Sequence, residues 1–174
     1  MLKKNGFQVK PLSRSDIRNL TLTLRKKLGL QDHPYFPVIE FLEKWMPEVL
    51  FPEFNFEYVA ESEMGSAEGL TIPEENVIRI REDVYMAAMR DEGRARFTIA
   101  HEIGHYVMHR HQTPCFARAN VSLPAYMDSE WQANTWAGEL LMPYYLTKGM
   151  TIYEIKEKCK VSESAATYQL SKIA

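Results

Sequence analysis

Residues 97–105 place the pattern H-E-x-x-H inside an apolar stretch that has the spacing of a helix. Residues four apart on a helix lie on the same face, one turn from each other, so the rings of His101 and His105 can converge on one metal ion. Glu102 is rotated away from that line by about a quarter turn or more, where its carboxylate can reach a water molecule beside the metal. The segment therefore predicts a buried helix with a zinc site and with Glu102 as the general base.

A catalytic zinc ion takes three protein ligands and keeps a fourth position open for water, so one more ligand has to come from elsewhere. His109 does not qualify, because it lies eight residues beyond His101, which is about 12 Å along a helix axis. We expect His109 to lie behind the ligands or at the surface. The ligand types favour zinc, although manganese or iron could occupy the same donors.

Two acids on the next predicted helix, residues 129–142, are the candidates for the third ligand. At 100° per residue, Glu130 lies on a stripe of mostly small or apolar side chains that can pack against another helix. A buried carboxylate there needs a partner, and a metal ion is a strong one. Glu139 lies about half a turn away around the axis and is expected to be solvated. We therefore expect Glu130 to be the ligand; the alternative is an acid that complements the positive end of the helix dipole.

The remaining periodicity predicts a mainly helical α+β chain with a small three-stranded antiparallel sheet. The strands are expected in the alternating stretch from Phe54 to Ala60 and at 69–72 and 77–80. Ser13 can cap the first helix, and the second is expected to end near Pro47. The helices are predicted at 14–28, 38–46, from about 82 to a break at 91–93, at 94–109, at 129–142 and, as a pair that resembles a helix-turn-helix, within 151–174.

Changes of pattern along the chain divide it into three parts. Residues 1–50 are expected to form a helical N-terminal segment, residues 51–146 a metallopeptidase core, and residues 147–174 a helical hairpin packed on that core. Residues 148–174 contain five lysines and three glutamates, a positive excess that is weak for DNA binding. A packing or partner-docking role is therefore expected for the hairpin.

Charge and composition exclude several classes of protein. The formal net charge is −2 with both signs spread along the chain, so no basic block indicates a nucleic-acid-binding surface. The two cysteines make no disulfide framework, and no apolar run is long enough for a signal peptide or a membrane span. We expect a soluble cytoplasmic protein with no membrane partner.

Two blocks of the sequence, RFTIAHEIGH at 96–105 and EWQANTWAGELLMP at 130–143, resemble the ImmA/IrrE family of metallo-endopeptidases. The second block is the more specific of the two, because H-E-x-x-H occurs in many unrelated zinc enzymes. The resemblance extends over about residues 50–170 and is weaker in the first 50 residues. It implies a zincin-like fold for the core of the chain.

The resemblance also implies a gluzincin-like site. Its residues, carried over position by position, are His101, His105, Glu102 and Glu130. Gln132 and Trp136 are mild departures, since the family often has Glu and Phe there, and neither is expected to touch the chemistry. A further group that stabilises the oxyanion is usual. The sequence leaves four candidates for it open, namely Tyr106, His111, Arg118 and Tyr126.

Members of the ImmA/IrrE family often cleave, or are paired with, a helix-turn-helix repressor of the Xre type. The resemblance therefore implies a regulatory zinc endopeptidase whose partner is such a repressor. The alternative is a DNA-binding or repressor-sequestering regulator with a metal site that is not catalytic. Direct DNA binding is not expected, because the charge of the C-terminal hairpin is low.

Overall fold

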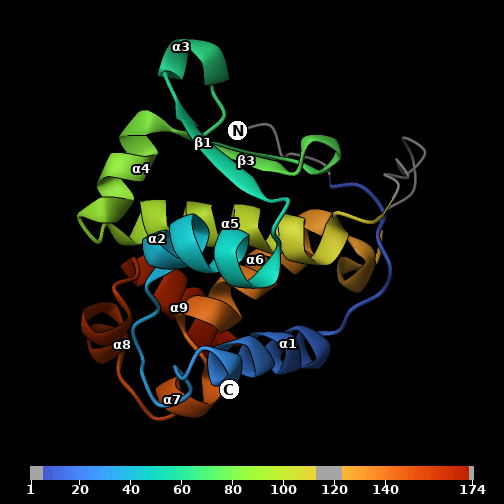
Figure 1. The fold of residues 1–174 in the computed structure, drawn as a ribbon. Helices are drawn as coiled ribbons and strands as arrows, with labels where there is room; N and C mark the ends of the chain where they lie inside the picture. The colour runs from blue at the N-terminus through green and yellow to red at the C-terminus, as the bar shows by residue number, and fades with distance from the viewer. Residues whose placement is uncertain (1–5, 113–122, 173–174) are drawn as a thin grey trace.

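The computed structural model describes residues 6–112 and 123–172, and its fold is α+β with a small three-stranded sheet, as predicted (Figure 1). The α-helices are α1 (Arg14–Lys27), α2 (Val38–Glu40), α3 (Glu61–Met64), α4 (Glu82–Met89), α5 (Gly93–His109), α6 (Ser129–Leu141), α7 (Tyr144–Thr147), α8 (Ile152–Cys159) and α9 (Glu163–Ser171). The other helical elements are a π-helix, η1 (Phe41–Leu50), and two 3-10 turns, η2 (Pro73–Glu75) and η3 (Ala125–Met127). The strands are β1 (Asn55–Val59), β2 (Gly69–Ile72) and β3 (Val77–Arg81). Within the described ranges, no helix combines the length and the apolar character needed to cross a bilayer.

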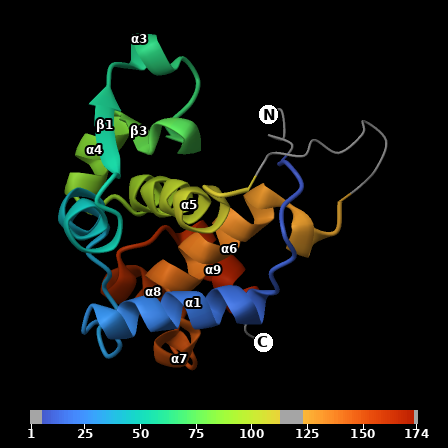
Figure 2. The same ribbon diagram turned by 45° about the vertical axis from the view of Figure 1, so that its right-hand side comes forward.

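Helix α5, which carries the H-E-x-x-H pattern, lies between the sheet on one side and α6 on the other (Figure 1 and Figure 2). Helix α1 packs against α6, so that the sheet, α5, α6 and α1 follow one another as layers. The core between these layers contains Ile78 and Ile80 of β3, Ile99 and Ile103 of α5, and Leu140 of α6, none of which has exposed surface. The histidine pair therefore lies on the central element of the fold.

The sheet is mixed, with the strand order β1-β3-β2. Strands β2 and β3 form an antiparallel hairpin through η2, whereas β1 pairs in parallel with the other edge of β3. The prediction of a wholly antiparallel sheet is therefore wrong. Residues 60–68, which include α3, carry the chain past the end of β3 before β2 begins, and alternation of apolar residues gives no information about that crossing.

The first two helical segments differ in how well they could be predicted. Helix α1 begins as expected, because Ser13 and Asp16 each accept a hydrogen bond from the other's backbone N–H. The second segment does not end at Pro47, because α2 continues into η1 and the proline lies inside that π-helix. In a π-helix the hydrogen bond reaches back five residues, so the wider turn relieves the clash between a proline ring and the carbonyl four residues earlier.

The C-terminal helices α8 and α9 form the predicted pair and lie against the rest of the chain. Ile155 and Cys159 of α8 have no exposed surface. The turn between the two helices touches the first residue of α5, Gly93. A Cβ atom at Gly93 would lie 2.4 Å from the carbonyl carbon of Val161 and from the nitrogen of Ser162, so only a residue without a side chain permits this contact.

Arg25 is a buried cation that ties α1 to the rest of the chain. It has no exposed surface, and burial lowers the pKa of its guanidinium to about 10. The guanidinium donates five hydrogen bonds of 2.6–3.2 Å to the backbone carbonyls of Leu30, His33, Pro34 and Leu140. One side chain therefore serves four carbonyls, of which that of Leu30 also accepts a hydrogen bond from the N–H of His33.

Replacing Arg25 by Met keeps an unbranched side chain but removes all five donors. We expect the free energy of unfolding to fall by about 3 kcal/mol, because a hydrogen bond to a charged group is worth about 1.5–3 kcal/mol and carbonyls are left unpaired. Urea unfolding measures the change. The exposed neighbour Lys26 supplies the control Lys26→Met, which should change stability by less than about 0.5 kcal/mol. Equal losses in the two variants would contradict this role of Arg25.

Candidate metal centre

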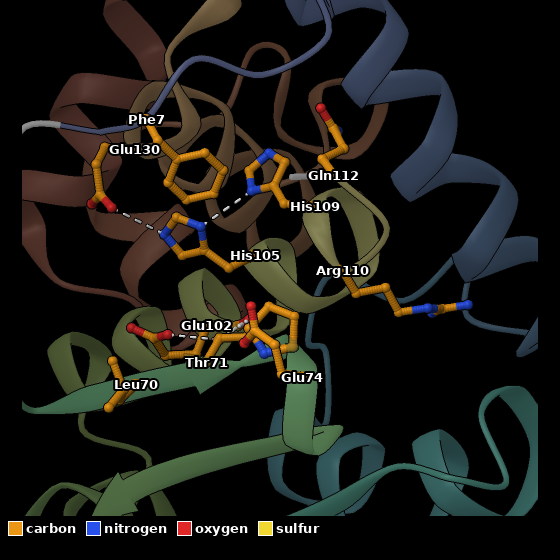
Figure 3. A pocket seen from close by; sticks show the side chains of 11 residues that line it. Phe7, Leu70, Thr71, Glu74, Glu102, His105, His109, Arg110, Gln112 and Glu130 are labelled. Carbon is orange, nitrogen blue, oxygen red and sulfur yellow. Dashed lines mark hydrogen bonds and ion pairs between the residues drawn. The ribbon is translucent and has the colours of Figure 1, made fainter. Parts of the chain in front are cut away.

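His101 and His105 lie one turn apart on α5, and Glu130 reaches them from the first turn of α6 (Figure 3 shows His105 and Glu130). The Nε2 atoms of the two rings are 3.0 Å apart. Glu130 Oε2 is 3.4 Å from Nε2 of His101, and Glu130 Oε1 is 3.2 Å from Nε2 of His105. One ligand atom from each residue lies within 4.8 Å of the others, so the three side chains together could hold a metal ion.

The close packing of α5 on α6 sets this geometry. Gly104 of α5 faces Trp136 of α6, and a Cβ atom at Gly104 would lie 2.8 Å from Cδ1 of that ring. Asp128 caps α6 by accepting hydrogen bonds from the N–H groups of Glu130 and Trp131. Glu130 is thereby placed in the first turn of α6, where the helix dipole also favours an acid. Glu130 therefore reaches the histidines from the same position in which it complements the positive end of the helix dipole.

The protonation states of the three side chains are coupled. Burial on its own would raise the pKa of Glu130, but the hydrogen bonds and charges of His101 and His105 hold that pKa well below its ordinary value of 4.5. Burial would likewise lower the pKa of His101, but the carboxylates of Glu130 and Glu102 outweigh it and raise the pKa above the ordinary 6.5. The group therefore favours a positive charge, a proton or a metal cation, between the rings and the carboxylate.

Glu102 lies on the wall of the same cavity and is held from strand β2 (Figure 3). It is only 6% exposed, and its Oε2 accepts a hydrogen bond of 2.7 Å from the hydroxyl of Thr71. Gly69 permits this contact between strand and helix, because a Cβ atom there would lie 2.7 Å from Cγ of Glu102. Sequence reasoning missed both residues, since a threonine and a glycine in a short strand carry no sign of their contact with a distant helix.

The second ring nitrogen of each histidine also has a partner. Nδ1 of His101 is 3.0 Å from Oδ1 of Asn134. Nδ1 of His105 is 3.2 Å from Nδ1 of His109, whose Nε2 is 2.9 Å from Oε1 of Gln132. His109 is 2% exposed, and burial lowers its pKa to about 4. His109 therefore lies behind His105, and Gln132 contacts it, although the sequence places Gln132 outside the chemistry.

The expectation that Glu139 is solvated is wrong. The residue has no exposed surface, and its carboxylate accepts hydrogen bonds of 3.0–3.1 Å from Arg14 and Arg18. Helical spacing correctly places it away from Glu130, but α1 covers that side of α6 and brings the two arginines. Glu139 therefore joins α1 to α6 and is not part of the group that could hold a metal.

The cavity beside the histidines has a volume of about 370 Å³ and is lined by residues of the N-terminal segment, β2, η2, α5 and α6. Arg110 is a cation on its wall that sequence reasoning did not select. Of the expected candidates for stabilising an oxyanion, Tyr106, His111 and Tyr126 do not line this cavity. Tyr106 has no exposed surface at all. The fourth candidate, Arg118, lies outside the described residues.

Comparisons with known proteins identify relatives of the chain. The model of the IrrE N-terminal-like domain, a peptidase family, matches residues 56–171, which is more than half of the chain. Among solved structures, a Mycobacterium tuberculosis transcriptional regulator is similar, with a TM-score of 0.60 and 17% sequence identity over 90% of this chain and 46% of that protein. At this identity the similarity concerns the fold alone, and the chain spans less than half the length of that regulator. None of the curated proteins that were compared matches the chain.

In the metal-free protein, the pair formed by Glu130 and His101 should stabilise the fold within a limited pH window. The depressed pKa of Glu130 contributes stability above its ordinary 4.5, and this contribution is lost as the pH falls toward the folded value. The raised pKa of His101 contributes stability that is fully present below its ordinary 6.5 and is lost as the pH rises through the folded value.

We therefore expect the stability difference between the wild type and Glu130→Gln to be largest near about pH 5.5 and smaller at about pH 8. Urea unfolding in the presence of a chelator, repeated across this range, measures the difference. A difference that stays constant with pH would contradict the coupling between the two side chains.

Proposed function

The chain belongs to the IrrE N-terminal-like family, and we propose that it is a zinc-dependent endopeptidase with a regulatory role. The observation that carries the proposal is the meeting of His101, His105 and Glu130 at one point, with Glu102 on the wall of the same cavity. Two imidazoles and one carboxylate are the ligand set of a catalytic zinc site, which keeps a fourth position for water. A structural zinc site takes a fourth protein ligand, and the described residues add none to this group.

The spacing of the donor atoms fits a zinc ion. Ligand atoms at about 2.0–2.1 Å from a tetrahedral ion lie roughly 3.3 Å from one another. The two imidazole nitrogens of His101 and His105 are 3.0 Å apart, and each lies 3.2–3.4 Å from one of the two carboxylate oxygens of Glu130, which is close to that spacing. Zinc, when bound, supplies a Lewis acid that polarises a peptide carbonyl and activates a water molecule. Manganese and iron accept the same donor types, so zinc is proposed on ligand preference.

We assign proton transfer to Glu102. Its Oε2 is engaged by Thr71, and among the described residues no hydrogen-bond donor engages its Oε1, which is free to accept a proton from the attacking water. The same carboxyl group then donates that proton to the nitrogen of the leaving amine, so Glu102 ends each cycle as a carboxylate. The hydrogen bond from Thr71 keeps the carboxylate at the cavity wall during both transfers.

Strand β2 offers a place for a peptide substrate. It lies at the edge of the sheet, and in the described part of the chain only β3 pairs with it. An extended peptide can add to such an edge through main-chain hydrogen bonds. Because Leu70 and Thr71 line the same cavity as His105 and Glu130, a peptide on this edge runs close to the ligand group. This arrangement supports cleavage of an internal peptide bond of a bound substrate, as the proposed endopeptidase activity requires.

We propose that the physiological substrate is a helix-turn-helix repressor of the Xre type and that the chain cleaves it in the cytoplasm. This part of the proposal is supported by the resemblance of residues 96–105 and 130–143 to the ImmA/IrrE family. The similar solved structure is called a transcriptional regulator, which agrees with a regulatory role. The competing function is a regulator that binds the repressor without cutting it.

The test is incubation of the purified, zinc-loaded chain with an Xre-type repressor encoded beside its gene, followed by mass spectrometry of the products. We expect fragments with the wild type and a rate about 10²–10⁴-fold lower with Glu102→Gln, because the variant keeps the shape of the site but loses the base. Its zinc content should equal that of the wild type. Glu157→Gln, an exposed change on α8, is the matched control and should cleave normally.

Three results would decide against parts of this proposal. Absence of any bound divalent ion would remove the metal centre. Full cleavage by Glu102→Gln would reject Glu102 as the base. A stable complex with an intact repressor would favour sequestration over cleavage.

A further inference from the structure

A chain of hydrogen bonds runs from two backbone carbonyls to the inner ring nitrogen of His105 (Figure 3 shows its last step, from His105 to His109). It begins at the carbonyls of Lys10 and Tyr126, passes through the side-chain amide of Gln132 and the ring of His109, and ends at Nδ1 of His105. Gln132 has no exposed surface and His109 is 2% exposed, so solvent hardly competes for these bonds. The chemistry of the partners assigns a direction to each bond.

The orientation of the Gln132 amide follows from its two carbonyl partners. One side-chain atom of Gln132 lies 2.8 Å from the carbonyl oxygen of Lys10 and also 2.8 Å from that of Tyr126. A carbonyl oxygen only accepts hydrogen bonds, so this atom has to be the NH₂ group, which has two hydrogens to donate. The reversed amide would set three oxygens against one another. Oε1 of Gln132 therefore faces His109, at 2.9 Å from its Nε2.

The same reasoning passes through the ring of His109. Because Oε1 of Gln132 only accepts, Nε2 of His109 has to carry a hydrogen. A neutral imidazole with a hydrogen on Nε2 has a lone pair on Nδ1, and that atom is 3.2 Å from Nδ1 of His105. Nδ1 of His105 is therefore the donor. Its Nε2 is then left with a lone pair, on the side where His101 and Glu130 converge. In the metal-free chain Glu130 Oε1, which is 3.2 Å from this Nε2 and only accepts, favours a hydrogen on Nε2 instead, so His109 and Glu130 have opposite effects on the tautomer of His105.

We propose that Gln132 and His109 are positioning residues that hold His105 in the tautomer with a hydrogen on Nδ1 and a free lone pair on Nε2. The proposal rests on the proposed function in one respect, namely that Nε2 is the atom that would meet the metal. His101 is held differently, by a direct contact with Asn134, whose side chain is exposed. His105 thus has a buried, backbone-anchored support that His101 lacks.

One of the two carbonyls that anchor this series of hydrogen bonds, that of Lys10, lies in the N-terminal segment, residues 6–12, which the family match does not include. The segment runs beside the start of α6, where the N–H of Val9 donates to the carbonyl of Met127 at 3.0 Å. Its residue Gln8 also forms an antiparallel bridge with Asp128. These contacts hold the carbonyl of Lys10 where Gln132 can reach it. A segment far from the H-E-x-x-H pattern in sequence therefore takes part in preparing one of its histidines.

The direct test is nitrogen-15 NMR of the histidine rings in the metal-free, full-length Glu130→Ala variant at about pH 8, where histidine rings are ordinarily neutral and the Glu130 carboxylate no longer competes for a hydrogen on Nε2 of His105. Nitrogen shifts distinguish a ring nitrogen that carries hydrogen from one that does not. We expect hydrogen on Nδ1 of His105 and on Nε2 of His109. Hydrogen on Nε2 of His105, or free exchange between its two tautomers, would overturn the proposal. The measurement needs no cleavage, so a chain that proves inactive as a peptidase still decides it.

The variant Gln132→Met supplies a second test, because it keeps an unbranched side chain and removes the acceptor for His109. We expect the tautomer preference of His105 to be lost and the affinity for Zn²⁺, measured by competition with a chelator, to fall about 10–100-fold. Gln169→Met is the matched control, since Gln169 is 1% exposed and donates to a backbone carbonyl but does not contact these histidines. Equal affinities in the two variants would count against the proposal, and the spectrum of Glu130→Ala decides it if Gln132→Met does not fold.

Discussion

The packing of α5 directly on α6 is the contact on which the rest of the site depends. Gly104 lets the two helices approach until Trp136 fills the space that a side chain would need. The Asp128 cap fixes the start of α6, so that Glu130 lies 3.2–3.4 Å from two imidazole nitrogens. Because that carboxylate and those rings come from helices that meet only in the folded core, loosening this contact would separate the donors even if each helix stayed intact.

The electrostatics of the cluster follow from that contact. The two histidines lower the pKa of the half-buried Glu130 carboxylate, and this carboxylate raises the pKa of His101, which means that the folded chain attracts a positive charge to this point. A divalent cation satisfies all three donors at once, whereas protons can only be shared between them. Glu102, held separately by β2, remains available for chemistry because it is not part of this cluster.

Local patterns predicted which residues of α5 and α6 face the candidate site, and failed for contacts that a third element makes with these helices. The spacing of His101 and His105 and the stripe through Glu130 are properties of single helices, and the structure brings these residues together. Glu139 was misjudged because helical spacing describes α6 alone and cannot show that α1 covers its far side with arginines. The parallel pairing of β1 with β3 and the contact of Gly69 with Glu102 likewise depend on how distant segments cross. These features follow from the tertiary arrangement, which produces no periodic pattern of residues in the sequence.

X-ray absorption spectroscopy at the zinc edge of the reconstituted chain measures which side chains hold the metal ion. We expect two imidazole nitrogens and oxygen ligands from a carboxylate and a water molecule, all at about 2.0–2.2 Å. In Glu130→Ala the nitrogen contribution should remain while the carboxylate contribution disappears. A spectrum dominated by sulfur, or one without imidazole scattering, would contradict the assignment of the metal centre to this cluster.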